Sequence, residues 1–271
     1  MMDIAIARPA GESRAERAVR RHPLAGALAF FLVFELVHAL LAWDGGRVLE
    51  TFARDAPATW RGPIAWSIYT ILAVLPVAVL GWWRETGLTR LGRTGAWPLL
   101  FLPLLAGLPF VLVGFNLSGD LVIPLIIVGT TLIALNEELF FRGVLLEMLR
   151  PLGWRRAITI TAALFGSAHA LNLLSGANLP FTVLQVVATT AGGVTLAAIR
   201  VRTGSLWPLI VVHALLDAIA LSTLTGAGVE SPMLMPAVFL WGALNLALWP
   251  LGWRLLRGRT EAELTALYDG A

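Results

Sequence analysis

Apolar runs long enough to cross a lipid bilayer recur along this chain from Leu24 to Trp253. A transmembrane helix needs ~20 mostly apolar residues. Only 14% of the 271 residues are charged, against about 25% in ordinary soluble domains. The sequence therefore predicts an all-α, polytopic membrane protein with about eight transmembrane helices. They are expected at residues 24 to 43, 63 to 83, 96 to 116, 121 to 149, 157 to 173, 180 to 199, 206 to 224 and 233 to 253.

Arginine supplies all 20 basic residues, and its distribution predicts the orientation of the chain. Positively charged residues accumulate in cytoplasmic links between membrane spans. With eight spans, only Arg47, Arg54 and Arg61 fall on the outer side, Arg142 lies inside the fourth run, and the other sixteen fall on the cytoplasmic side. We therefore expect both termini in the cytoplasm. Because these arginines flank spans, a nucleic-acid partner is not expected, and the lipid bilayer is.

The polarity of the chain suggests three parts: a polar cytoplasmic arm at 1–22, a transmembrane domain at 23–254 and a cytoplasmic tail at 255–271. In the tail, Thr260 and Glu263 have the spacing of a helix capping box. The chain has no cysteine, which excludes disulfides and thiolate chemistry. Arginine without lysine, together with abundant alanine, glycine and leucine, suggests a GC-rich bacterial genome. We expect a multi-pass protein of the bacterial cytoplasmic membrane.

The fourth apolar run contains two adjacent glutamates, Glu137 and Glu138, followed by Arg142, with Glu147 nearer its end. A charged group at the centre of a span costs about 3 kcal/mol and therefore marks a functional site by default. On an α-helix, Glu138 and Arg142 are i,i+4 neighbours that can pair, while Glu137 points about 100° away. Glu137 is then left without a local partner and is a candidate general acid or base. The alternative interpretation is a salt network that only packs the helices.

Two later runs each add a histidine. Phe165 and His169 are one turn apart in the fifth run, with small residues between them, and His213 and Asp217 are one turn apart in the seventh. Together with Glu137 they could supply a base, an acid and oxyanion donors, or three metal ligands with a place for water. Zinc held by His169 and His213 stays open, because no His-Glu-x-x-His spacing supports it.

A depth estimate tests whether these side chains can meet. At a rise of ~1.5 Å per residue, Glu137 lies ~24 Å from the outer end of its run, inside a core ~30 Å thick. His213 lies ~10 Å from the inner surface, which is a similar depth. His169 lies ~18 Å from the inner end of its run. The fifth run must therefore start later, tilt or break if the three are to converge.

The patterns Glu137-Glu138-x-x-x-Arg142, Phe165-x-x-x-His169 and His213-x-x-x-Asp217, in this order, resemble the three-motif signature of the CPBP family. This is the CAAX-protease and bacteriocin-processing family of intramembrane proteases, also described as CAAX amino-terminal protease or Abi. The resemblance covers Glu137 to Asp217, within a motif core at 121–224. It implies a helical membrane fold with a cavity open toward the cytosol. The implied activity is hydrolysis of a peptide bond in a membrane-associated protein or peptide.

The resemblance also implies roles for the site residues. Glu137 would activate the attacking water together with His169, and Glu138 would orient the site while held by Arg142, with Phe165 in support. These roles come from the family pattern and not from the spacing of the residues.

By the same pattern His213 and Asp217 would stabilise the oxyanion. Asparagine is frequent at the second position in the prenyl-protein proteases, and this chain has Asp217 instead. An amide can donate a hydrogen bond to an oxyanion and an ionised carboxylate cannot. Asp217 could instead orient His213 or help to bind a metal, and whether a metal is used stays open.

Three other functions compete with the protease. A proton-coupled transporter could use Glu137, Glu138 and His213 as a relay. A non-enzymatic immunity or scaffold protein could retain the same residues as a packing network. A rhomboid-like protease could use Ser167 as its nucleophile if a base reached that hydroxyl. Substrate identity and oligomeric state stay open.

Glu35 and His38 form a further intramembrane pair, in the first run and outside the three motifs. At i,i+3 on one helix they are expected to satisfy each other. The alternative is that they add a polar wall to the cavity, which would require both to lie near Glu137.

Overall fold

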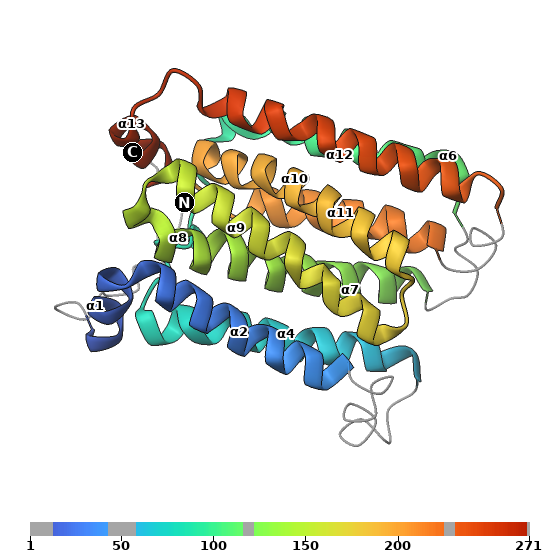
Figure 1. Ribbon diagram of the computed structural model, residues 1–271, viewed down its shortest axis with the longest axis horizontal. Helices are drawn as coiled ribbons and strands as arrows, with labels where there is room; N and C mark the ends of the chain where they lie inside the picture. The colour runs from blue at the N-terminus through green and yellow to red at the C-terminus, as the bar shows by residue number, and fades with distance from the viewer. Residues whose placement is uncertain (1–12, 43–57, 116–121, 225–230, 270–271) are drawn as a thin grey trace.

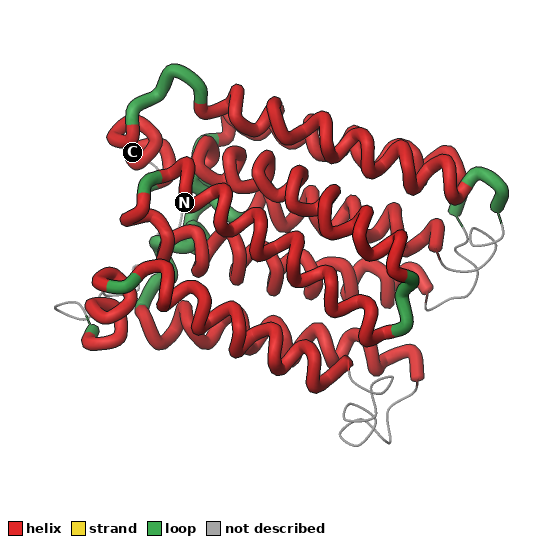
Figure 2. The backbone as a smooth tube through the Cα atoms, viewed as in Figure 1, coloured by secondary structure: helices red, strands yellow, loops and turns green. Residues whose placement is uncertain are grey.

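The structure is a computed structural model that describes residues 13–42, 58–115, 122–224 and 231–269. Every regular element in these ranges is a helix, and the long helices run side by side in one bundle (Figures 1 and 2). Seven helical stretches within these ranges are long and apolar enough to cross a membrane. The expected all-α membrane fold is therefore confirmed. Residues 1–12 of the arm, and the outer link with Arg47 and Arg54, lie outside the described ranges.

Most of the spans are single long helices, and short helices lie at the ends of the bundle. The long helices are α2 (Pro23–Ala42), α4 (Ala58–Leu80), α7 (Val122–Glu137), α9 (Trp154–Ala168), α10 (Leu179–Thr203), α11 (Trp207–Leu224) and α12 (Leu234–Leu256). The short ones are α1 (Arg14–Arg21), α8 (Leu146–Leu149), η5 (Arg150–Leu152), η6 (His169–Ser175) and α13 (Glu261–Tyr268).

The third expected span is built from four short helical pieces instead of one helix. They are η2 (Thr94–Leu100), α5 (Phe101–Leu104), η3 (Leu105–Gly107) and α6 (Leu108–Val113). Pro98, Pro103 and Pro109 explain the breaks, because proline removes a backbone donor and clashes with the preceding turn. The run Thr94–Val113 is nevertheless apolar enough to cross the membrane.

The seventh expected span is the short one. Helix α11 provides a described apolar stretch, Trp207–Thr223, that is shorter than the seven full-length candidates. At ~1.5 Å per residue it still approaches the thickness of the hydrocarbon core. Figure 1 shows α1 and α13 at the same end of the bundle, which an even number of crossings requires. Which side of the membrane this end faces stays a prediction.

The fourth span supplies the centre of the fold. After α7 the helix widens into the π-helix η4 (Glu138–Leu145) and then returns to α8. All residues from Glu138 to Leu149 are buried, because this segment contacts α2, α4, α9 and α10. A π-helical turn inserts an extra residue into the helix and is frequent at functional sites.

Helices α9 and α10 approach each other closely through glycine. A Cβ placed on Gly166 would overlap the side chain of Thr190 and come within 2.7 Å of the Val186 carbonyl oxygen. Gly193 on α10 similarly faces Ala162 on α9. Small residues at helix interfaces allow this approach in membranes. This close packing places the end of α9 against α10.

The tail packs on the bundle through α13. Thr260 and Glu263 form the expected capping box, which is confirmed. Tyr268 is fully buried with the guanidinium of Arg200 4.0 Å from its ring centroid. Oδ2 of Asp269 lies 2.7 Å from Nη2 of Arg150. The tail therefore closes one end of the bundle.

Candidate active site

Glu138 is the buried anchor of the site. Its side chain is 0% exposed, and Oε1 accepts a hydrogen bond from Nη1 of Arg142 at 2.9 Å. The same oxygen lies 2.7 Å from Nδ1 of His213, which belongs to α11. The expected i,i+4 pair is thus present. Because an ionised carboxylate only accepts, His213 carries a proton on Nδ1 and donates it to Glu138.

Nε2 of His213 is directed toward two further carboxylates. It lies 3.6 Å from Oε2 of Glu137 and 3.6 Å from Oδ2 of Asp217. These separations are longer than a direct hydrogen bond and fit charge pairing or a bridging water. Glu137 keeps a quarter of its side chain exposed, whereas the adjacent Glu138 keeps none. The two glutamates therefore face different surroundings, as their helical spacing predicts.

His169 lies at the junction between α9 and η6. Its Nδ1 lies 2.9 Å from the carbonyl oxygen of Phe165, so Nδ1 carries the proton and Nε2 keeps a lone pair. The ring of Phe165 is perpendicular to those of His169 and His213, with centroids 5.0 and 6.1 Å away. The guanidinium of Arg142 stacks 3.9 Å from the centroid of the same phenyl ring. Phe165 thus packs against Arg142 of the buried ion pair and against both imidazoles.

A cavity of about 460 Å³ brings the predicted residues together. Glu137, Phe165, His169, His213 and Asp217 all line it. Glu138 and Arg142 lie behind the wall and contact its lining residues. The structure thus joins all three motifs at one place.

His169 lines the cavity although it lies at the far end of its helix. Helix α9 begins at Trp154, earlier than expected, and its α-helical part ends at Ala168. In Figure 1 it is inclined more steeply than α12.

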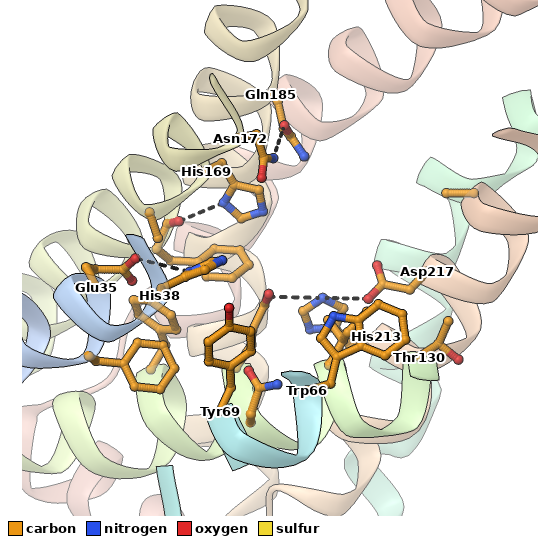
Figure 3. A pocket seen from close by; sticks show the side chains of 18 of the residues that line it. Glu35, His38, Trp66, Tyr69, Thr130, His169, Asn172, Gln185, His213 and Asp217 are labelled. Carbon is orange, nitrogen blue, oxygen red and sulfur yellow. Dashed lines mark hydrogen bonds and ion pairs between the residues drawn. The ribbon is translucent and has the colours of Figure 1, made fainter. Parts of the chain in front are cut away.

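The structure adds residues to the cavity wall that sequence reasoning left aside. Glu35 and His38 pair at 3.4 Å, as expected, but both also line the cavity. Figure 3 shows them across the cavity from His213. Glu35 and His38 therefore do more than pair with each other, because they also form a polar part of the cavity wall. Their intramembrane charge was the available signal.

Several uncharged polar residues of the wall carried no such signal. Tyr69 lines the cavity from α4, and Asn172 donates to Gln185 at 2.9 Å, both on the same wall. Neutral polar groups are far less costly in a span than charges, so their presence there does not mark a site. Only the contact between helices identifies them.

Ser167 is not placed to act as a nucleophile. Its side chain is exposed, it donates to the carbonyl oxygen of Leu164 at 2.8 Å, and it is not part of the cavity wall. The hydroxyl is thus directed along its own helix, away from both imidazoles. The rhomboid-like alternative therefore has no support in the described part of the chain.

The donor set does not fit a zinc ion held by His169 and His213. Within the described ranges, no group of three or more His, Asp or Glu side chains is arranged to hold a metal. Each imidazole has its Nδ1 engaged, by the Phe165 carbonyl and by Glu138, which leaves Nε2 as the nitrogen available to a ligand.

Comparison with known proteins agrees with the three motifs. Residues 118–219 match the family described as Rce1-like, Type II CAAX prenyl endopeptidase. The matched segment is less than half of the chain and contains every motif residue from Glu137 to Asp217. Searches of curated proteins and of solved structures found no match. Over residues 118–219 this multi-pass membrane protein is therefore similar to the Rce1-like family of CAAX prenyl endopeptidases, in agreement with the resemblance of its motifs.

Proposed function

We propose that this protein is an intramembrane endopeptidase that hydrolyses a peptide bond with a water molecule activated by Glu137. The observation that carries this proposal is the meeting of Glu137, His169, His213 and Asp217 around one cavity of about 460 Å³ in an apolar bundle. Convergent polar groups in an otherwise apolar pocket are typical of an enzyme site. The family match to residues 118–219 supports the same reaction class.

The two adjacent glutamates, Glu137 and Glu138, have different roles. Glu138 is fully buried and holds both Arg142 and His213 through Oε1, so it is a positioning residue. Glu137 lines the cavity and has no hydrogen bond to Arg142. It can therefore reach a water molecule, which the buried Glu138 cannot.

Glu137 takes a proton from the water while the water oxygen attacks the peptide carbonyl carbon. Nε2 of His169 keeps a lone pair and provides a second acceptor for this water. When the tetrahedral intermediate collapses, the C–N bond breaks and Glu137 returns the proton to the leaving nitrogen. A positioned general base of this kind contributes about 10²- to 10⁴-fold to the rate.

His213 stabilises the oxyanion, and Asp217 orients His213. With Nδ1 donating to Glu138, a second proton on Nε2 makes the ring a donor toward the cavity. Asp217 lies 3.6 Å from this nitrogen and balances the charge of the imidazolium. A carboxylate at this position cannot itself donate to the oxyanion, so Asp217 acts through His213.

The substrate is a membrane-associated protein or peptide, and the proposed location is the bacterial cytoplasmic membrane. The lipid-facing surface is apolar, with leucine, valine and phenylalanine side chains exposed on α2, α7 and α12. A peptide would reach the cavity from the cytosolic half of the bilayer if the termini lie inside. Nothing in this mechanism requires a free soluble substrate.

The proposal is tested by comparing peptides and protein termini in cells that carry wild-type chain or Glu137→Gln at matched membrane abundance. New termini that require Glu137 would support the protease and identify its substrate. Glu263→Gln is the matched control, because glutamine keeps the capping box on α13. If proteomic coverage of the membrane and secreted fractions is high and no Glu137-dependent terminus is found, the protease proposal is wrong. The next hypothesis to test is then proton-coupled transport.

A further inference from the structure

A second polar cluster lies in the cavity, on helices outside the family-matched segment. Glu35 and His38 project from α2 and Tyr69 from α4, and all three line the cavity with the proposed catalytic groups. The ring centroids of His38 and Tyr69 are 4.8 Å apart. Figure 3 shows this cluster, which we call the α2–α4 cluster, across the cavity from His213 and Asp217.

The carboxylate of Glu35 is buried, and its pairing with His38 is too long for a good hydrogen bond. Glu35 is only 9% exposed, and among the described residues neither of its oxygens has a hydrogen-bond partner. The nearest basic group is Nδ1 of His38 at 3.4 Å. Burying a charge without hydrogen bonds costs free energy. A positively charged group on a ligand would offset this desolvation cost at Glu35.

The cavity as a whole has a negative lining. Glu35, Glu137 and Asp217 line it, against one imidazolium, His213, and no arginine is among its described lining residues. Arg142 lies behind the wall, 1% exposed, and is already paired with Glu138. An apolar surround concentrates the field of such carboxylates toward an entering ligand. The cavity is therefore electrostatically complementary to a cation.

The α2–α4 cluster also presents hydrogen-bond acceptors. A carboxylate beside Nδ1 of His38 favours a proton on that nitrogen, which leaves Nε2 with a lone pair. The side chain of His38 is a third exposed, so this acceptor is reachable. The hydroxyl oxygen of Tyr69 can accept a second bond. Ammonium and guanidinium groups supply several N–H donors and no acceptor, which matches this set.

We propose that Glu35, His38 and Tyr69 form a subsite for a cationic group of the peptide substrate, the guanidinium of arginine or the ammonium of lysine. The inference rests on the proposed function, because it names a substrate class for the same cavity. His38 and Tyr69 contact the cation, and Glu35 acts behind His38 to hold its tautomer and to supply the negative charge. The subsite would select peptides with a basic residue near the cleaved bond.

The test uses the full chain with Glu137→Gln, reconstituted in lipid nanodiscs so that ligands bind without turnover. The probes are fluorescent ten-residue apolar peptides with a single arginine at each position in turn, each paired with the same peptide carrying uncharged citrulline. We expect the arginine peptide to bind at least about fivefold more tightly at one or two positions, the effect of a modest charge pair. Adding Glu35→Gln is expected to reduce this ratio to about one, and adding Glu263→Gln to leave it unchanged.

Two outcomes would overturn the subsite: equal affinity for arginine and citrulline at every position, or a preference that survives Glu35→Gln. If the Glu35→Gln protein is not recovered as a folded species, His38→Gln and Tyr69→Phe must lower the ratio instead. Turnover of the same peptides by wild-type protein separates this inference from the proposed function. Glu137-dependent cleavage without an arginine preference rejects only the subsite, and an arginine preference without such cleavage rejects only the protease.

Discussion

Nδ1 of His213 lies 2.7 Å from Oε1 of Glu138, a residue 75 positions earlier in the chain. This contact joins α11 to the π-helix η4 in the buried centre of the bundle. It sets the tautomer of His213 and therefore the direction of Nε2, which points toward Glu137 and Asp217. A single hydrogen bond thus connects the first motif with the third.

Replacing Arg142 with leucine is expected to destabilise the protein by about 3–5 kcal/mol, because it leaves the buried charge of Glu138 with only His213 as a partner. Thermal or denaturant unfolding of the purified protein would measure the loss. The double variant Arg142→Leu with Glu138→Gln should recover part of it, since no uncompensated charge remains. Unchanged stability of the single variant would mean that the pair at 2.9 Å contributes nothing.

Replacing Asp217 with asparagine distinguishes two roles of this position. If Asp217 orients His213 through its charge, asparagine should lower kcat about tenfold, equivalent to ~1.4 kcal/mol, and change KM little. Leucine, which can neither pair nor accept, should lower kcat further. An Asp217→Asn variant that is faster than wild type would instead assign the position to direct donation to the oxyanion. The measurement is steady-state kinetics on a Glu137-dependent substrate.

Replacing Gly166 with alanine should destabilise the protein by about 1–3 kcal/mol, because the new methyl group overlaps Thr190 and forces α9 away from α10. Activity should fall as well, since His169 lies three residues further on. Gly95→Ala is the matched control, as a Cβ there has nothing within 4 Å. Equal melting temperatures for the two variants would show that the helices separate without cost.

The orientation can be measured directly because the chain has no cysteine of its own. Thr94 and Ser175 are both exposed, and the arginine distribution predicts Thr94 inside and Ser175 outside. A membrane-impermeant maleimide added to intact cells should label Ser175→Cys and leave Thr94→Cys unlabelled until the membrane is opened. The reverse pattern would place both termini outside.

The helical fold and most of the site could be predicted from local patterns. Glu138 and Arg142 pair within one helix, and the separation of Glu137 from Glu138 follows from 3.6 residues per turn. The breaks of the third span are also local, because Pro98, Pro103 and Pro109 cannot continue a regular ladder of hydrogen bonds. These features depend on residues only a few positions apart.

The tilt of α9 and the membership of the cavity wall could not be predicted in this way. Glu35, Tyr69 and Gln185 share a cavity with Glu137 because three helices from distant parts of the chain pack around η4. Helix periodicity predicts which residues lie on the same face of a helix. It does not predict which other helix packs against that face.

The sequence alone therefore determined that this chain is a bundle of membrane helices with three ionisable motifs in its interior. Those properties follow from the length of the apolar runs, the free-energy cost of a charge within a span and the spacing of residues along a helix. Each of these can be assessed within one segment of the chain. Only the tertiary structure decided that Glu138 holds His213 and that Glu35 and His38 face the same cavity. Such contacts depend on how side chains from separate helices fill the space between them, and that close packing is a property of the whole bundle.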